Sequence, residues 1–353
     1  MTKVLMKGNE ALAEAAVKAG CRYFFGYPIT PQNEIPQYLA WRLPEVGGVF
    51  IQAESEVAAI NMVYGAAAAG ARVMTSSSSP GISLKQEGIS YIAGSELPCV
   101  IVNMQRGGPG LGSIQPGQAD YFQAVKGGGH GDYHLIVLAP ATIQEAVDLM
   151  GKAFDLADEY RNPVMILGDG VLGQMMEAVE LPEKEAVAPE KPWALKGSKG
   201  RTPNLINSLY LEASKLEQHN YRLQEKYQKI QDKETMAESY LTDDADIVLV
   251  GYGSSARIAK AAVDQARESG IKAGLFRPIT LYPFPHQEIQ EACKNAQQVL
   301  TVEMSLGQLV EDVRYHLEFK VPVYLYGRVG GMIPTPREVG NEIKRLVKEG
   351  GVS

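Results

Sequence analysis

Short apolar runs alternate with longer amphipathic stretches along the first half of this chain. The apolar runs predict strands at residues 22–27, 48–52, 72–76, 98–104, 134–139 and 163–168. The amphipathic stretches between them predict helices, the clearest of which cover residues 8–19, 31–42, 55–69 and 141–159. Strands that are apolar throughout and are separated by helices are typical of a parallel sheet covered on both faces. We therefore expect an α/β unit over residues 1–182.

The same alternation returns near residue 244. Strands are predicted at residues 246–253, 272–278, 298–303 and 321–327. Helices are predicted at residues 255–269, 285–296, 306–318 and 336–349. This pattern predicts a second α/β unit over residues 244–353.

Residues 183–243 separate the two units. Residues 183–205 are rich in proline, lysine, glutamate and glycine, which is typical of a linker. Residues 206–240 are densely charged, with apolar residues at irregular helical spacing, and predict a long exposed helix. Two roles are open for this helix: a solvated connection between the units, or a surface that packs on a partner chain.

The stretch FFGYPITPQN (24–33) leads from the first predicted strand into the next helix. Thr30 has the side chain of an N-cap, and Pro31 suits the first helical position, where no backbone N–H is needed. The simplest prediction is therefore a helix that starts at residue 31. The two prolines also make the segment stiffer than a plain loop, which suggests that it holds a side chain in place at the end of the strand.

Composition and charge narrow the function classes. The chain has 353 residues, of which 45% are hydrophobic and 21% charged, as in globular proteins with a substantial core. Its net charge of −7 and pI near 5.4 argue against nucleic acid or an anionic membrane as the main partner. The N-terminal stretch carries acidic residues and lacks the apolar core of a secretory signal, and no run reaches the ~18 apolar residues of a membrane span. We therefore expect a cytoplasmic protein.

The three cysteines are Cys21, Cys99 and Cys293. They are far apart in sequence and none belongs to a CxxC motif, so a disulfide framework, a zinc site and an iron–sulfur cluster are all disfavoured. Each lies in an apolar stretch, which predicts a buried and inert side chain. Metal-based redox chemistry would therefore have to lie in another chain.

Two glycine-bearing stretches resemble nucleotide-binding motifs only in part. GYGSSARIAKA (251–261) follows a predicted strand and opens a helix, but the next strand ends in Arg277 where the dinucleotide fingerprint requires an acidic residue. This predicts a tight strand-to-helix turn, with a nicotinamide-dependent dehydrogenase as an alternative. RGGPGLGS (106–113) lacks the Gly-Lys-Ser/Thr of a phosphate-binding loop.

Polar side chains follow four predicted strands of the first unit. They are Thr30 after the first strand, Glu54 and Glu56 after the second, the serines of SSSSPG (76–81) after the third, and Arg106 after the fourth. Each has a simpler role: a helix cap for Thr30, a favourable first-turn acid for Glu56, a surface position for Arg106. Because the carboxyl ends of parallel strands meet at one edge of the sheet, their coincidence there favours a ligand site.

These segments carry a family resemblance. YPITP, ESEVAAINMVYGAAAAGARVMTSSSSPG and NMQRGGPG, in this order and spacing, resemble the alpha subunit of the 2-oxoacid:ferredoxin oxidoreductases. The resemblance spans essentially the whole chain and is most like the subunit of the branched-chain (2-oxoisovalerate) enzymes. It implies a thiamine-diphosphate-enzyme pyrimidine-type domain over residues 1–182 and a transketolase C-terminal-like domain over residues 244–353.

The resemblance also assigns roles to residues. Glu56, with Ala59 three residues later, matches the glutamate that hydrogen-bonds the aminopyrimidine of thiamine diphosphate; Glu54 is followed at that spacing by Val57 instead. Thr30 and Arg106 match residues that contact the substrate, with Arg106 as a carboxylate clamp. Ile29, Thr30 and Ser78 are expected beside the cofactor. LGDGVLGQ (167–174) begins like the magnesium motif of thiamine enzymes but lacks its paired asparagines, so Asp169 is expected to be a turn or interface residue.

Partners follow from the same resemblance. A beta subunit would hold the diphosphate and its Mg²⁺, a gamma subunit and a ferredoxin-like delta subunit would complete the complex, and [4Fe–4S] clusters would lie only in partner subunits. Coenzyme A would be a co-substrate, and an external ferredoxin would accept the electrons released by oxidative decarboxylation. No metal ligand is expected in this chain. The alternatives are the alpha subunit of a 2-oxoglutarate enzyme, an NAD(P)-dependent dehydrogenase, and a non-catalytic scaffold subunit.

Overall fold

Residues 3–349 are described by the computed structural model, and the larger of its sheets is built from the first half of the chain together with one later strand. Its strands are β2 (Tyr23–Gly26), β3 (Val49–Gln52), β4 (Val73–Ser77), β5 (Cys99–Gln105), β6 (Ile136–Leu138), β7 (Pro163–Asp169) and β12 (Thr280–Tyr282). Their order is β12-β6-β7-β5-β4-β2-β3, and all neighbours are parallel except β12, which runs antiparallel to β6. The six strands predicted for the first unit are thus confirmed, and so is their parallel arrangement.

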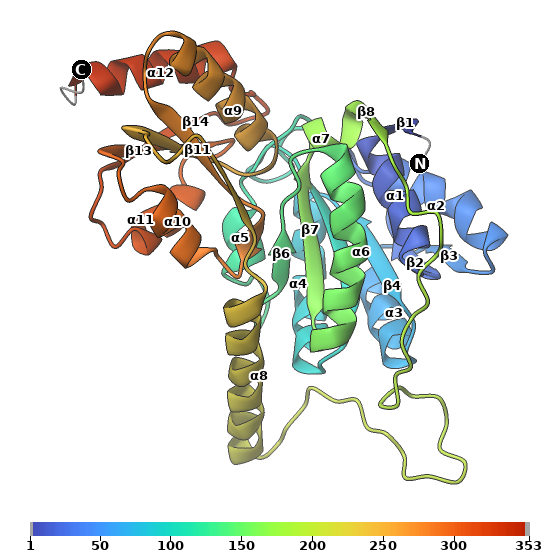
Figure 1. The fold of residues 1–353 in the computed structure, drawn as a ribbon. Coiled ribbons are helices and arrows are strands. Elements are labelled where there is room, and N and C mark those ends of the chain that lie inside the picture. Colours follow the sequence, from blue (N-terminus) through green and yellow to red (C-terminus); the bar gives the residue numbers. More distant parts are fainter. Residues whose placement is uncertain (1–2, 350–353) are drawn as a thin grey trace.

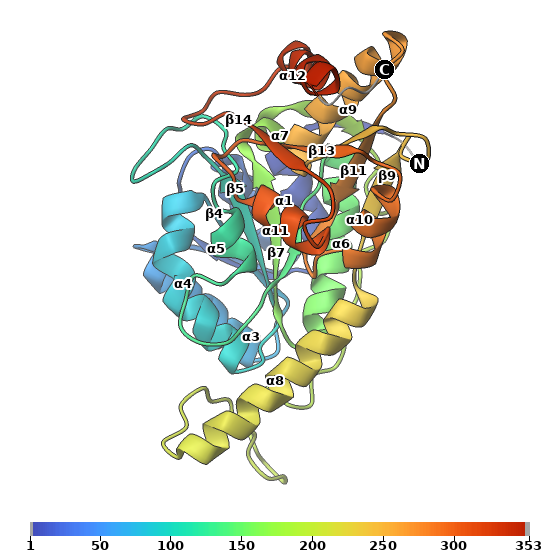
Figure 2. The same ribbon diagram turned by 90° about the vertical axis from the view of Figure 1, so that its left-hand side faces the viewer.

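Helices cover both faces of this sheet. They are α1 (Gly8–Lys18), α2 (Glu34–Glu45), α3 (Glu56–Ala68), α4 (Ser79–Gly94), α5 (Tyr121–Val125), α6 (Ile143–Tyr160) and α7 (Gly170–Gln174). Helix α1 packs on α2 and α6, and α3 packs on α4. Figure 2 shows α3 and α4 on one side of the sheet and α6 on the other. Because both faces are covered, the central strands β4, β5 and β7 are buried along their whole length.

The second sheet has five strands. They are β9 (Ala237–Tyr240), β10 (Ile247–Val250), β11 (Ala273–Pro278), β13 (Gln298–Glu303) and β14 (Val323–Gly327), in the order β14-β13-β10-β11-β9. Only β9 is antiparallel to its neighbour. The accompanying helices are α9 (Gly253–Glu268), α10 (His286–Ala292), α11 (Leu309–His316) and α12 (Pro336–Glu349). The four predicted strands are confirmed, whereas β9 and β12 were not predicted.

The two units share a continuous apolar core, because buried side chains of β10 and β11 belong to the same cluster as those of the first sheet. Ion pairs made by the buried side chain of Arg277 add to this contact. Arg277 at the end of β11 donates to Glu145 of α6 at 2.8 and 2.9 Å and to Glu238 of β9 at 2.6 and 3.0 Å. The position that would need an acid in a dinucleotide-binding domain therefore joins the two units instead.

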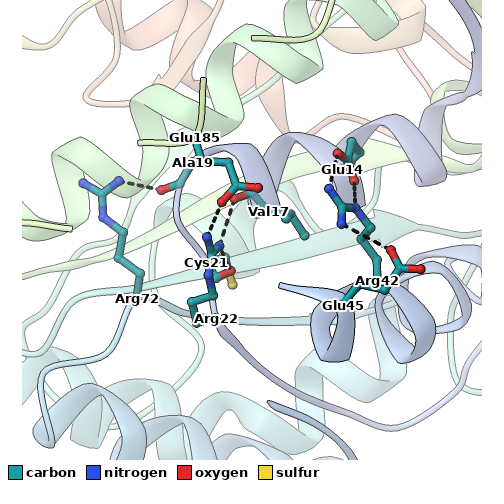
Figure 3. A network of polar contacts seen from close by, with 9 residues as sticks. All are labelled: Glu14, Val17, Ala19, Cys21, Arg22, Arg42, Glu45, Arg72 and Glu185. Carbon is teal, nitrogen blue, oxygen red and sulfur yellow. Dashed lines mark hydrogen bonds and ion pairs between the residues drawn. The ribbon is translucent and has the colours of Figure 1, made fainter. Parts of the chain in front are cut away.

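The linker first runs along the first unit and then loops away from it before the next helix (Figure 1). Two backbone hydrogen bonds join it to this unit: Ala186 N–H donates to Lys18 O at 2.7 Å, and Leu195 N–H donates to Ala68 O at 2.8 Å. Figure 3 shows the ion pair between Arg22, just before β2, and Glu185 of the linker. The first part of the linker thus follows the first unit. Just before the linker, β8 (Met176–Val179) forms a small antiparallel pair with β1 (Val4–Lys7).

The charged segment is helical only in part. Helix α8 spans Ala213–Lys233, so the prediction of a helix over 206–240 is wrong at both ends: residues 206–212 are irregular, and 237–240 form β9 of the second sheet. One face of α8 is buried against the first unit through Leu223, Tyr227 and Ile230. The helix is therefore amphipathic and packs on its own chain along this face.

The start of α2 also differs from the prediction. The helix begins at Glu34 with Asn33 as N-cap residue, not at Pro31 with Thr30 as cap. Residues 29–32 form a turn instead, in which Gln32 N–H donates to Ile29 O at 3.1 Å. The Gln32 side chain is fully buried at the sheet edge and accepts a hydrogen bond from Ser76 Oγ at 2.5 Å. Because of this contact across the sheet, the helix starts later in the chain, at Glu34, and Thr30 lies in the loop before it.

Other structural expectations are confirmed. The three cysteines are buried, unpaired thiols. Among the helices of residues 3–349, none is both long and apolar enough to span a bilayer. The division into segments 1–182, 183–243 and 244–353 stays a prediction.

Candidate functional site

The site predicted from the sequence lies where β2, β4 and β5 end. Arg106 follows β5, and its Nη1 donates to the backbone carbonyl of Thr30 at 3.0 Å, across 76 residues of sequence. Its Nη2 donates to Leu111 O at 2.8 Å. The guanidinium is almost fully buried, and Nε has no hydrogen-bond partner within residues 3–349. Arg106 therefore holds the Thr30 loop and keeps one buried N–H available.

Glu56 is the first residue of α3, whose N-cap is Ser55: the Ser55 hydroxyl accepts from Ala58 N–H at 3.2 Å. A carboxylate in the first helical turn is stabilised by the helix dipole. Glu56 is only 7% exposed, whereas Glu54, two residues earlier, is exposed to solvent. Burial therefore favours Glu56 over Glu54 as the site residue, as does the Glu-x-x-Ala spacing.

A glycine makes room beside the Glu56 carboxylate. A Cβ built on Gly81 of α4 would lie 2.7 Å from Glu56 Oε1 and 2.1 Å from Ser77 Oγ. Those separations are too short for any side chain, so only glycine lets α4, Ser77 and Glu56 approach this closely.

The serines after β4 have different environments. The hydroxyls of Ser77 and Ser78 are buried and have no partner within the described residues. The Ser79 hydroxyl, by contrast, donates to Asp120 at 2.6 Å and accepts from Arg106 N–H at 3.1 Å. Buried hydroxyls without a partner are costly, so Ser77 and Ser78 are the atoms of this edge that a ligand could satisfy.

Asp120 completes the polar layer beneath Arg106. It accepts from the Ser79 hydroxyl and from Asn103 Nδ2 at 2.9 Å. Burial raises the pKa of the Asp120 carboxyl, while these two hydrogen bonds and the charge of Arg106 oppose the rise. Asp120 therefore orients Ser79, and through it the backbone of Arg106.

A lysine that the sequence analysis did not single out lies behind the site. Lys85 of α4 is fully buried, and its Nζ donates to Thr75 Oγ1 at 2.7 Å and to Ser76 O at 3.0 Å. Burial lowers the pKa of Lys85 to about 7, against the charge of Glu56, which raises it. A lysine on the otherwise apolar face of α4, between Ile82 and Ile89, is the sequence signal that could have found it.

The loop after Arg106 is held by the second unit. Gln118 is fully buried, donates from Nε2 to Tyr252 O at 3.0 Å, and accepts at Oε1 from Ser255 Oγ and from Met304 N–H at 2.6 and 3.1 Å. The role of Gln118 could not be inferred from the sequence, because its partners lie more than 130 residues away along the chain. Gln118 therefore couples the position of the Arg106 loop to the second unit.

Asp169 joins the two units in a similar way. Its carboxylate accepts from Val171 and Leu172 N–H at the start of α7 and from the Ser254 hydroxyl at 2.8 Å. Burial raises the pKa of the Asp169 carboxyl, and these hydrogen bonds oppose the rise. The prediction that Asp169 is a turn or interface residue is confirmed, as is the tight turn that opens α9 at Gly253, whose φ is +53°.

The geometry of this edge fits the aminopyrimidine end of thiamine diphosphate. It offers a buried carboxylate on Glu56 and two hydroxyls, on Ser77 and Ser78, that have no partner within the described residues. Ile29 is half-buried in the adjoining loop. For the metal end of such a cofactor, no three His, Cys, Asp or Glu side chains converge as ligands anywhere in residues 3–349.

Comparison with known families covers most of the chain. Residues 14–240 match the thiamine-diphosphate-binding domain of pyruvate flavodoxin/ferredoxin oxidoreductases, and residues 245–339 match core domain II of pyruvate:ferredoxin oxidoreductase. Two ketoisovalerate oxidoreductase subunits named VorB are 52% and 53% identical to this chain. They come from Methanothermobacter marburgensis (99% of both chains covered) and Methanothermobacter thermautotrophicus (98% of both). The 2-oxoglutarate synthase subunit KorA of Methanothermobacter thermautotrophicus is 38% identical, over 97% of this chain and 98% of its own.

A solved structure shows the same arrangement of elements. It is a 2-oxoglutarate:ferredoxin oxidoreductase from Magnetococcus marinus with 2-oxoglutarate, coenzyme A and succinyl-CoA bound, and it matches with a TM-score of 0.83 at 26% identity. The match covers 98% of this chain and 65% of the Magnetococcus chain, so this chain spans less than two thirds of the length of that chain. A split-gene transketolase shares the fold with a TM-score of 0.62 at 16% identity.

Proposed function

Because the chain belongs to the family of thiamine-diphosphate-binding pyruvate flavodoxin/ferredoxin oxidoreductases, we propose that it is the pyrimidine-side subunit of a 2-oxoacid:ferredoxin oxidoreductase that acts on 2-oxoisovalerate. The complex would convert the 2-oxoacid and coenzyme A to acyl-CoA and CO2 and pass two electrons to ferredoxin. One observation carries this choice of substrate: identity to the ketoisovalerate relatives is 52–53% over nearly the whole chain, against 38–39% for the 2-oxoglutarate synthase relatives.

Glu56 is the residue to which we assign the proton-holding role beside the cofactor. When bound, thiamine diphosphate supplies the carbon nucleophile and the electron sink that decarboxylation of a 2-oxoacid needs. The Glu56 carboxylate would hydrogen-bond the aminopyrimidine ring and hold a proton there. Its burial supports this role, because a hydrogen bond to a charged group is stronger where water is excluded.

Thr30, Ile29 and Ser78 would position the cofactor and the substrate. The Thr30 hydroxyl receives only a long contact from Asn33 Nδ2, at 3.4 Å, so it is available to a ligand. The Ser78 hydroxyl is buried and unpartnered within the described residues. Arg106 would bind the substrate carboxylate through its free Nε–H while its terminal nitrogens hold the loop.

The complex has several subunits, as the subunit names of the relatives imply. Within it, a beta subunit would hold the diphosphate and Mg²⁺, a gamma subunit and a ferredoxin-like delta subunit would complete the assembly, and the partners would carry the [4Fe–4S] clusters. Asp169 supports this division, because its carboxylate is already engaged by Ser254 and the start of α7.

The nicotinamide alternative has no support in the site. Gly253 opens α9 beside Gln118 and Asp169, and Arg277 is bound by two carboxylates. The scaffold alternative loses its motivation as well, because the charged helix α8, which suggested it, packs on its own chain.

The proposed function is tested on the native complex, purified without oxygen. We expect coenzyme A-dependent reduction of a viologen dye with 2-oxoisovalerate at a kcat/KM well above that for 2-oxoglutarate. Reduction with 2-oxoglutarate alone would assign the chain to the 2-oxoglutarate enzymes, and reduction with neither 2-oxoacid would refute the proposal.

A further inference from the structure

A cavity of about 460 Å³ opens beside Thr30, and Glu56 is not among the described residues that line it. Apolar side chains from four segments line it: Pro31 of the Thr30 loop, Ile114 and Pro116 of the Arg106 loop, Val171 of α7 and Ile333 of the second unit. The volume is typical of a small-molecule site. Because Thr30 lines this cavity and its carbonyl is bound by Arg106, the cavity adjoins the proposed carboxylate clamp.

Glu34 is the one ionisable side chain among the described residues that line the cavity. Its carboxylate accepts from Asn9 Nδ2 at 2.8 Å and from Gln174 Nε2 at 2.9 and 3.0 Å. Burial alone would raise the pKa of Glu34, but these hydrogen bonds and the nearby Lys7 charge hold it below its usual value, so Glu34 is anionic at neutral pH.

The same donors fix the wall itself. Asn9 Nδ2 and Gln174 Nε2 also donate to Pro31 O, at 2.8 and 3.1 Å. Glu34 and the Thr30–Pro31 loop are therefore held by one pair of amides, and the anion cannot turn away without loosening the loop. This wall presents apolar surface and a single carboxylate, that of Glu34, which Lys7 Nζ faces at 3.6 Å from outside the described lining of the cavity.

We propose that this cavity receives the side chain of the 2-oxoacid and selects aliphatic 2-oxoacids over 2-oxodicarboxylates, with Glu34 as the residue that rejects a second carboxylate. The inference rests on the proposed function. An isopropyl group would pack on Pro31, Ile114, Val171 and Ile333. The distal carboxylate of 2-oxoglutarate would instead meet Glu34, with no lysine or arginine in the described lining of the cavity to neutralise it.

The test compares kcat/KM for 2-oxoisovalerate and 2-oxoglutarate in the assembled complex, by dye reduction. Glu34→Gln removes the charge at constant size, and we expect the preference for 2-oxoisovalerate to fall about tenfold. Val171→Arg places a cation in the cavity, and we expect a larger fall, with a gain in kcat/KM for 2-oxoglutarate. Glu45→Gln is the matched control: the same change at the far end of α2, on a side chain that is 56% exposed, should leave the preference as it is.

The outcomes separate the two proposals. If the wild-type complex reduces dye with neither 2-oxoacid, the proposed function fails. If it is active but Glu34→Gln and Val171→Arg keep the wild-type preference, the cavity does not hold the substrate side chain and only this inference fails. Should Val171→Arg not assemble, as thermal unfolding and gel filtration would show, the isosteric Glu34→Gln decides alone. Equal shifts in Glu34→Gln and Glu45→Gln would also overturn the inference, because they would reflect the net charge of the chain.

Discussion

The Arg106 guanidinium donates to the carbonyl oxygen of Thr30 at 3.0 Å and so joins the loops that follow β5 and β2. These two residues lie 76 positions apart in sequence. The contact fixes the entrance of the site, because the loop that carries Thr30 also lines the cavity beside it. Substitutions at this edge should therefore affect substrate binding more than the fold.

Replacing Arg106 should weaken substrate binding. Arg106→Ala removes the buried Nε–H and both backbone contacts, and we expect KM for the 2-oxoacid to rise about 10²-fold, from the loss of a charged hydrogen bond. Steady-state kinetics of the complex measure this, with Arg345→Ala on the exposed face of α12 as control. An unchanged KM in Arg106→Ala would limit Arg106 to holding its loop.

Glu56→Gln should abolish turnover without dissolving the complex. The amide keeps the size of the side chain but cannot hold a proton as a carboxylate does, so we expect kcat to fall by about 10²–10⁴. Glu54→Gln, the same change on an exposed neighbour, should retain activity. The second readout is thiamine diphosphate binding followed by circular dichroism, which should weaken only in Glu56→Gln. Full activity of Glu56→Gln would contradict the assignment.

Lys85 should make stability depend on pH. Its pKa is about 7 in the folded chain, below the ~10.4 of an unfolded lysine. Between these values the unfolded chain binds more protons, so raising the pH from 7 to 10 favours the folded wild type by up to about 1.4 kcal/mol per pH unit; below pH 7 both states are protonated and this dependence vanishes.

Lys85→Met removes this contribution. The titratable groups that act on the amino group are Glu56 of α3 and Cys99 of β5, and both remain in the variant. We expect the free energy of unfolding of the wild type, measured by urea denaturation at pH 7, 8 and 9, to rise relative to that of the variant. Parallel curves would mean that the Lys85 ammonium is solvated in the folded chain.

Arg277 should stabilise the contact between the two units. Arg277→Gln leaves Glu145 and Glu238 without their shared cation, and Glu145 is mostly buried, so we expect a loss of about 3 kcal/mol in the free energy of unfolding. Arg345→Gln breaks ion pairs that are screened by solvent on the surface, and should cost much less than Arg277→Gln. Equal effects in the two variants would show that the Arg277 pair is not protected from solvent.

The sequence by itself determined the parallel strands of both sheets and the edge at which we propose the site. Apolar runs separated by helical periods leave few alternatives to parallel strands, and parallel strands bring their carboxyl ends together. This is why Thr30, Glu56, Ser78 and Arg106 could be placed on one edge before any contact was known. The motifs YPITP, SSSSPG and QRGGPG, in this order, were enough to recognise the family, because the order of motifs can be read from the sequence without knowing any contact.

The tertiary structure decided what depends on contacts between distant segments. Gln32 reaches Ser76 across the sheet and shifts the start of α2 to Glu34, which overrides the local preference of Thr30 for a cap. The buried amino group of Lys85 and the fixed anion of Glu34 likewise depend on partners from other elements. Local propensity is worth only about 1 kcal/mol per residue, so a buried hydrogen bond or a packed neighbour from another element can outweigh it.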